Sequence, residues 1–404
     1  MKSLLKRVSF AALALLIGAG GAVAQPQDVK LGLLMPLTGR YAESGASVMR
    51  GVDLVIKQVN AGGGIKSLGG AKVVLVTADT GSDPAKTSLQ ARKLMADDRV
   101  SFILGPYSTP EAETFMPVAD RYQVGGVGLQ TTVIPKTPYF ATLSIPAAKF
   151  GEGYGDLVRW LRGRGVTINT VAITYANNDY GQVVSKAAAE ALTAQGVKVL
   201  DAIPVEPTVK DMTPIVLKVK SLDPDAVISA VYLADGVLLH RARFNLGYDK
   251  PVWIGGSAGF SDDKLWGLVG DEVARKTLTA SFGLAFFSAD AALPGMQTAI
   301  AQAKEQQTRV IDQSVMFGVQ AAHLAVEAFE KAASADAAAV NAAFRALRVP
   351  ARSAKHVLPF ISGDVAFDEN GLLRQTTPLF VQWRNGEKVL VYPPEVASAQ
   401  PILK

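Results

Sequence analysis

The sequence predicts an α/β protein made of two doubly wound lobes with largely parallel sheets. From residue 28 onward, apolar runs rich in β-branched residues alternate with segments of helical periodicity, and the same alternation starts again near residue 150. Two successive strand–helix–strand series of this kind are typical of open parallel sheets covered by helices. With 404 residues, the chain is long enough for two such lobes.

The first 24 residues are predicted to be a signal peptide. Three basic residues precede the apolar run 10–19, and Ala22-Val23-Ala24 supplies a small–x–small cleavage pattern. The apolar run is shorter than the roughly 20 residues that cross a bilayer, which disfavours a membrane anchor. We expect a mature chain that begins at Gln25. It should be free in the periplasm, because no cysteine is available for lipid attachment.

The first series contains three expected strands and three expected helices. In the first helix, Val48, Val52, Val55 and Val59 recur at the spacing of one helical face, and a glycine-rich turn follows. The third helix should begin near Thr109-Pro110, where a hydroxyl residue precedes a proline in the first turn. We expect strands over 29–37, 72–76 and 100–104, and helices over 48–59, 84–95 and from 109.

The second series repeats the alternation and then changes in character. We expect helices over 154–161, 181–194, 212–219 and 237–243, strands over 170–175, 197–203, 226–232 and 251–254, and a helical stretch over about 293–348. Near the C-terminus, Asn385-Gly386 is a strong hairpin turn signal between two strands, 379–383 and 388–392.

Composition disfavours several classes of function. The formal net charge of +5 includes three basic residues of the signal segment, no basic run is present, and aromatic residues make up only 7% of the chain, so nucleic-acid binding has little support. The absence of cysteine excludes a disulfide framework and a thiol nucleophile. Three dispersed histidines form no metal-ligand pattern, so we expect neither a metal nor a cofactor.

The loops at the carboxyl ends of the strands are the expected ligand contacts, because ligands of open parallel sheets bind there. Several of these loops are rich in Gly, Ser, Thr and Tyr, which offer hydroxyls and backbone N–H groups without a fixed charge. Where such a loop opens a helix, it can hold a carboxylate. The loops in question are 37–45, 105–109, 128–132, 175–181, 232–235 and 255–259.

At these loops the chain resembles the leucine/isoleucine/valine-type periplasmic substrate-binding proteins of ABC transporters. The resemblance covers about residues 28–390 and depends on the order and spacing of several short motifs rather than on any one of them. These motifs are Pro36-Leu37-Thr38-Gly39 with Ser44-Gly45, Val59-Asn60-Ala61-Gly62-Gly63-Gly64, Asp79-Thr80-Gly81-Ser82-Asp83-Pro84-Ala85, Ile103-Leu104-Gly105-Pro106-Tyr107-Ser108 and Asn178-Asp179-Tyr180-Gly181.

The resemblance implies the type I periplasmic binding protein fold, with two α/β lobes joined by a three-crossover hinge. Lobe 1 would take 28–147 and 280–358, and lobe 2 would take 148–279 and 359–395. The protein would be a monomer that binds a small-molecule solute by lobe closure and delivers it to an ABC permease in the inner membrane. Neither a catalytic residue nor a nucleic-acid partner is implied.

The same resemblance assigns the ligand contacts. Tyr107, Ser108 and Thr109 match the loop that binds the ligand carboxylate, and Gln130, Thr131 and Thr132 match the loop that serves both carboxylate and ammonium groups. Tyr180 and Tyr232 match tyrosines that close over the ligand, and Ser44 falls where relatives often carry an aromatic wall of the pocket.

One departure from the family pattern concerns the ammonium group of the ligand. Amino-acid binders place a glutamate in the loop after the strand that matches 251–254, whereas this loop reads Gly255-Gly256-Ser257-Ala258-Gly259. A buried ammonium group without an anionic partner is costly. Asp235 could replace the glutamate, with Ser257 as a further contact. Otherwise the ligand lacks an amino group.

The predicted function is capture of a small carboxylate-bearing solute, with a branched-chain or related amino acid as the first choice. The alternatives are an aromatic acid, an amide or another non-amino solute, and a sensor that binds in the same way. A more remote alternative is a serine hydrolase. Gly255-x-Ser257-x-Gly259 fits a nucleophile elbow after a strand, but only His323 and His356 follow it in the chain, and His323 lies on an apolar helical face.

Overall fold

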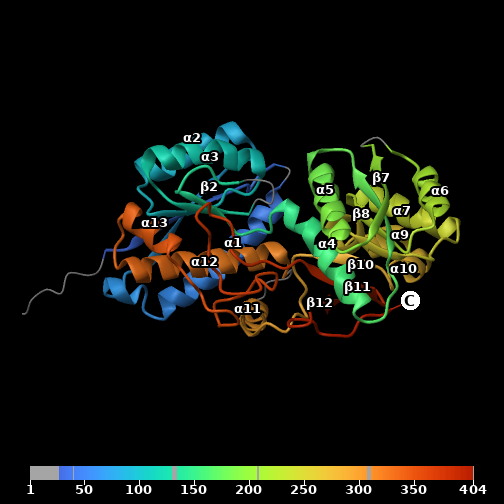
Figure 1. Ribbon diagram of the computed structural model, residues 1–404. Coiled ribbons are helices and arrows are strands. Elements are labelled where there is room, and N and C mark those ends of the chain that lie inside the picture. The colour runs from blue at the N-terminus through green and yellow to red at the C-terminus, as the bar shows by residue number, and fades with distance from the viewer. Residues whose placement is uncertain (1–26, 40, 130–133, 207–208, 307–310, 404) are drawn as a thin grey trace, which may run out of the picture.

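Two separate sheets organise the chain, as the sequence predicts. The computed structural model describes residues 27–39, 41–129, 134–206, 209–306 and 311–403. A five-stranded sheet and a seven-stranded sheet lie in two lobes side by side, each flanked by helices (Figure 1). The predicted fold class, with two doubly wound α/β lobes, is therefore confirmed.

The first sheet is entirely parallel and is built from short apolar strands. In β1 every residue except Lys30 is buried, as expected for a strand covered on both faces. The strands, in spatial order, are β2 (Val73–Asp79), β1 (Val29–Met35), β3 (Phe102–Leu104), β4 (Gly126–Gly128) and β5 (Phe140–Thr142). The helices of this lobe are α1 (Ala42–Ala61), α2 (Pro84–Arg92), α3 (Thr109–Tyr122), α11 (Pro294–Glu305), α12 (Gln313–Ala332) and α13 (Ala337–Arg345), with the short turns η1 (Lys66–Leu68) and η2 (Lys93–Asp97).

The second sheet is parallel in its first part and antiparallel at its far edge. Its strands, in spatial order, are β12 (Glu387–Tyr392), β11 (Leu379–Arg384), β10 (Phe282–Ala285), β9 (Val252–Gly255), β8 (Ala226–Ala230), β6 (Thr170–Ala176) and β7 (Lys198–Val205). Its helices are α4 (Ala147–Arg162), α5 (Asp179–Thr193), α6 (Thr213–Leu222), α7 (Leu233–Asn245), α8 (Ser257–Ser261), α9 (Leu265–Val269) and α10 (Asp271–Thr277). The β11–β12 turn has positive φ at Asn385 and Gly386, as the sequence predicts.

Two of the expected lobe boundaries need correction. The strand β10 pairs with β9 and β11, so the return to the first lobe expected near residue 280 comes after Ala285. The segment after 358, expected in lobe 2, first runs along lobe 1. Leu372 forms a bridge to Thr142, and the ring of Phe367 lies 5.1 Å from that of Phe344 in α13. Because such side chains are buried in the core of lobe 1, the chain crosses to lobe 2 for the last time only just before β11.

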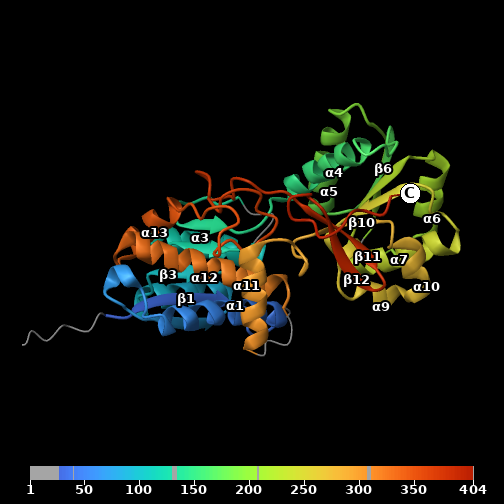
Figure 2. The same cartoon turned by 90° about the horizontal axis from the view of Figure 1, so that it is seen from below.

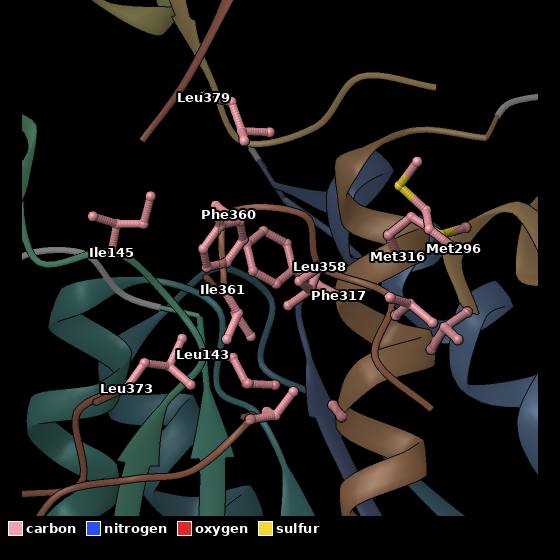
Figure 3. Close-up of a cluster of buried hydrophobic side chains, with 14 of the residues drawn as sticks. Leu143, Ile145, Met296, Met316, Phe317, Leu358, Phe360, Ile361, Leu373 and Leu379 are labelled. Atoms are coloured by element: carbon pink, nitrogen blue, oxygen red, sulfur yellow. The ribbon is translucent and has the colours of Figure 1, made fainter. Parts of the chain in front are cut away.

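The chain crosses between the lobes three times: from β5 to α4, from β10 to α11, and into β11 (Figure 2). Buried side chains from the segments around these crossings pack into one cluster. Figure 3 shows Leu143, Phe360 and Leu379 among its members. The ring of Phe360 lies 5.9 Å from that of Phe317 in α12 and 6.2 Å from that of Phe286, which follows β10. The hinge is therefore built around apolar contacts.

Candidate ligand-binding site

The loop after β1 is held in place by Asp79, the last residue of β2. Its carboxylate accepts hydrogen bonds from the Leu37 N–H at 2.8 Å and the Thr38 hydroxyl at 2.7 Å, and Lys86 Nζ lies at 2.9 Å. Although burial raises the pKa of Asp79, these hydrogen bonds together hold it well below its usual range. The carboxylate thereby fixes the loop that leads into α1, whose first turn carries Ser44.

Replacing Asp79 by asparagine should lower the free energy of unfolding at pH 7 by about 1–3 kcal/mol, because hydrogen bonds to a charged group are lost. The folded-state pKa is depressed, so this contribution is present above the unfolded value of about 3.9 and is lost as the pH falls below it. Denaturant unfolding at pH 7 and pH 3 should show the gap in stability between wild type and variant narrowing at pH 3, because the folded-state carboxyl group is protonated only at still lower pH.

A matched control for this variant is Asp223→Asn. The Asp223 carboxylate is 62% exposed and pairs with the equally exposed Lys250, so its loss should change stability by less than about 1 kcal/mol. Equal stability of the Asp79 variant and the wild type at pH 7 would contradict the role assigned to Asp79.

The structure brings Ser44 and Tyr107 together. Tyr107 follows β3, and Ser44 lies in the first turn of α1. Burial raises the pKa of Tyr107, while a side-chain hydrogen bond with Ser44 opposes that shift. The ring of Tyr107 lies 5.5 Å from that of Tyr41. A tyrosine with a hydroxyl neighbour therefore stands at the carboxyl ends of β1 and β3, where the sequence predicts ligand contact.

Ser108 serves α3 as its N-cap. Its backbone N–H and its hydroxyl both donate to Glu111 Oε2, at 2.8 and 2.7 Å, within a capping box. Glu111 is fully buried and also accepts from the Thr80 hydroxyl at 2.5 Å. The Ser108 proton is therefore engaged within lobe 1. The capping role agrees with the helix start predicted near Thr109-Pro110, and contact of Ser108 and Thr109 with a ligand stays a prediction.

In the second lobe, Tyr180 and Tyr232 form an aromatic pair at the carboxyl ends of β6 and β8. Their ring centroids lie 5.6 Å apart, and Asn178 Nδ2 donates to the Tyr232 hydroxyl at 3.2 Å. Burial raises the pKa of Tyr180 to about 12, so its hydroxyl is protonated at neutral pH. Tyr232 is 44% exposed. The structure thus brings together the two tyrosines that the resemblance assigns to the second lobe.

Asp235 lies at the third position of α7. Its pKa is raised by burial, against a hydrogen bond that its carboxylate accepts from the Tyr232 backbone N–H. This contact is one half of a capping box. Among the described residues Asp235 forms no salt bridge, and its position in the first turn is accounted for by the helix. The structure gives no indication that Asp235 replaces the glutamate of amino-acid binders.

Of the remaining predicted contacts, only Ser257 lies in the described part of the chain. Gln130, Thr131 and Thr132 lie outside the described residues. Ser257 begins α8, directly after the extended N-cap residue Gly256. The predicted signal peptide also lies outside the described residues.

The histidines give the hydrolase alternative no support. His240 is buried beside α8, and both of its ring nitrogens form hydrogen bonds. One is with the Gly259 carbonyl at 3.1 Å, and the other is with Arg243 Nη1 at 3.2 Å. Both ring nitrogens of His356 also form hydrogen bonds, with the Arg352 N–H and the Leu358 carbonyl. His323 lies in α12 of the other lobe, and burial lowers its pKa to about 4. Within the described part of the chain, no cluster of residues could hold a metal ion.

Comparison with known proteins bears directly on these two lobes and their strand-end loops. A family model described as periplasmic binding protein matches residues 28–387, which is nearly the whole described chain. The chain belongs to the periplasmic binding protein family. In the described residues of this periplasmic binding protein, no helix has the length and apolar character to cross a membrane.

Relatives and solved structures agree with this assignment. A Brucella suis protein named Leu/Ile/Val-binding protein homolog 7 is 26% identical, over 97% of this chain and 98% of its own. A putative branched-chain amino acid ABC transporter protein from Silicibacter pomeroyi superposes with a TM-score of 0.79 at 18% identity, over 93% of this chain and 98% of its own. A solute-binding protein from Rhodopseudomonas palustris, in complex with 3,4-dihydroxybenzoic acid, has a TM-score of 0.67 at 23% identity, over 89% and 95%.

Sequence reasoning did not identify Phe150 and Tyr154, which lie one turn apart on α4 of this periplasmic binding protein. The ring of Phe150 packs edge-on against Tyr180 at 6.5 Å, and Tyr154 is fully buried next to Phe380 at 5.8 Å. Their i, i+4 spacing is a signal of one buried helical face. Only the fold shows that this face lies beside the predicted ligand contacts.

Proposed function

We propose that this periplasmic binding protein captures a small carboxylate-bearing solute in the periplasm, by closure of its two lobes, and delivers it to an ABC permease. The observation that carries the proposal is the placement of aromatic and hydroxyl side chains at the strand ends of both lobes. Tyr107 with Ser44 stands in the first lobe, and Tyr180 with Tyr232 in the second. Such groups recognise a small polar solute without a fixed protein charge.

The mechanism is a population shift rather than a chemical reaction. A solute held by one lobe favours the closed arrangement if the second lobe adds contacts that the open arrangement lacks. Tyr180 and Tyr232 would supply those contacts, because neither side chain is fully buried. Tyr180 is partly buried, and Tyr232 is 44% exposed. The closed form would then present both lobes to the permease.

A thermal-shift screen of the mature protein, unfolded and refolded to remove carried-over solute, tests this function. The panel holds branched-chain amino acids, 2-oxo acids, hydroxybenzoates and short amides. A ligand at a hundred times its dissociation constant should stabilise the protein by about 2.7 kcal/mol, which is a readily measured rise in melting temperature. The methyl ester of the best acid is the matched control and should give little shift. A panel in which no carboxylate raises the melting temperature would contradict the proposal.

A further inference from the structure

We propose that the hydroxyls of Tyr154 and Tyr180, which converge beside Gly256, bind an uncharged oxygen of the solute. The solute would then be a carboxylic acid that carries a carbonyl or hydroxyl group where an amino acid carries its ammonium group. This inference rests on the proposed function, capture of a carboxylate-bearing solute, and specifies the class of that solute.

The geometry centres on Gly256, a buried residue directly after β9. A methyl group placed on Gly256 would point toward both phenols, with the Tyr180 hydroxyl at 3.4 Å and the Tyr154 hydroxyl at 3.6 Å. The next atom in reach is Cα of Ala230, the last residue of β8, at 3.7 Å. Two hydroxyls from different helices, α4 and α5, therefore lie within 3.6 Å of one point at the carboxyl ends of two parallel strands.

The Tyr154 hydroxyl has no hydrogen-bond partner among the described residues, although Tyr154 is fully buried. A buried hydroxyl without a partner destabilises a folded protein, so its retention calls for an explanation. Burial also raises the pKa of Tyr154 well above its usual value, which keeps the proton on the oxygen. The Tyr154 hydroxyl therefore keeps a proton that no described residue accepts.

The charges described around this point disfavour an ammonium group. Among the described side chains, the ionisable groups that shift the pKa of the two phenols are other tyrosines: Tyr180 acts on Tyr154, and Tyr232 acts on Tyr180. Asp235 is engaged with the Tyr232 backbone N–H. An ammonium group buried here would lack an anionic partner among the described side chains, which is costly. A carbonyl or hydroxyl oxygen would instead accept from a phenol and needs no counter-charge.

Leucine and 4-methyl-2-oxopentanoate form the matched pair of probes, because they share the carboxylate and the carbon skeleton. They differ only at the second carbon, which carries an ammonium group in leucine and a carbonyl oxygen in the 2-oxo acid. Valine and 3-methyl-2-oxobutanoate form a second pair, and 4-hydroxybenzoate supplies an aromatic acid with a hydroxyl group. Titration calorimetry on the refolded mature protein should show the best of these acids binding at least about 10-fold more tightly than either amino acid.

The variant that tests the phenols is Tyr154→Phe, which keeps the ring against Phe380 and removes only the hydroxyl. Affinity for the best acid should fall about 10-fold. The melting temperature of the unliganded protein should be unchanged or higher, because an unpartnered buried hydroxyl is removed. Tyr248→Phe is the control. Its hydroxyl is also buried and unpartnered within the described residues, but it packs beside Trp253, so affinity should stay unchanged.

The outcomes separate this inference from the proposed function. Tighter binding of leucine or valine than of the 2-oxo acids and the hydroxybenzoate would overturn the inference and leave carboxylate capture standing. An unchanged affinity in Tyr154→Phe would overturn the role of that hydroxyl. Failure of every acid and every amino acid to bind would contradict the proposed function, and the inference with it.

Discussion

Replacing Gly318 by alanine should destabilise the first lobe by more than about 3 kcal/mol, although the change adds a single methyl group. Gly318 in α12 and Gly51 in α1 lie where these two helices cross. A methyl group on Gly318 would lie 2.1 Å from the Val48 carbonyl oxygen, and one on Gly51 would lie 2.0 Å from the Val315 carbonyl oxygen. Both obstacles are backbone atoms, so a changed side-chain rotamer cannot relieve the clash, and the helices must separate.

Thermal unfolding followed by circular dichroism measures this effect. At roughly 2–4 °C per kcal/mol for a unit of 150–250 residues, the melting temperature should fall by about 6–12 °C. Gly267→Ala is the matched control. Gly267 lies in the helix α9 with no atom within 4 Å of the added methyl group, so the same change should be neutral or slightly stabilising. A Gly318 variant as stable as the control would show that the two helices do not pack this closely.

Long, strongly patterned elements were predictable from the sequence, whereas two of the three-residue strands, β4 and β5, were not. The strands β4, Gly126–Gly128, and β5, Phe140–Thr142, have three residues each and lie in the sheet because of their neighbours. The helix α4 begins at Ala147, well before the expected 154. Its glycines interrupt the helical periodicity of the sequence. They serve close packing instead, since a methyl group on Gly151 would meet Ala187 Cβ at 2.4 Å.

The candidate site was predictable as a set of loops, because parallel strands deliver their carboxyl ends to one edge. The pairing of Tyr180 with Tyr232 and of Ser44 with Tyr107 follows from that rule. The orientation of individual hydroxyls does not follow from it. Ser108 has an internal acceptor in Glu111 and Tyr154 has none among the described residues, and that difference depends on side chains far apart in the sequence. Hydrogen-bond satisfaction is a property of the packed molecule.

Replacing Gly256 by aspartate should reverse the selectivity inferred above. Gly256 has an extended backbone that any residue can adopt, with φ −67° and ψ 162°, and a methyl group there meets no atom closer than 3.4 Å. An aspartate would therefore place a carboxylate between the hydroxyls of Tyr154 and Tyr180. It would supply the anion that an ammonium group requires and would repel an acid that lacks one. The affinity ratio of leucine to 4-methyl-2-oxopentanoate should rise about 10- to 100-fold, equivalent to about 1.5–3 kcal/mol.

Gly256→Asn isolates the charge in this experiment. Asparagine has the shape of aspartate, and Gly256 is the N-cap of α8, a position that both residues favour equally. Stability and pocket volume should therefore change alike in the two variants, while only aspartate improves the relative binding of leucine. Equal affinity ratios in the two variants, measured by calorimetry with both probes, would mean that residue 256 does not face the ammonium position of the ligand. A rise confined to aspartate would identify the point between the two phenols as the place where this protein distinguishes an amino acid from an acid without an amino group.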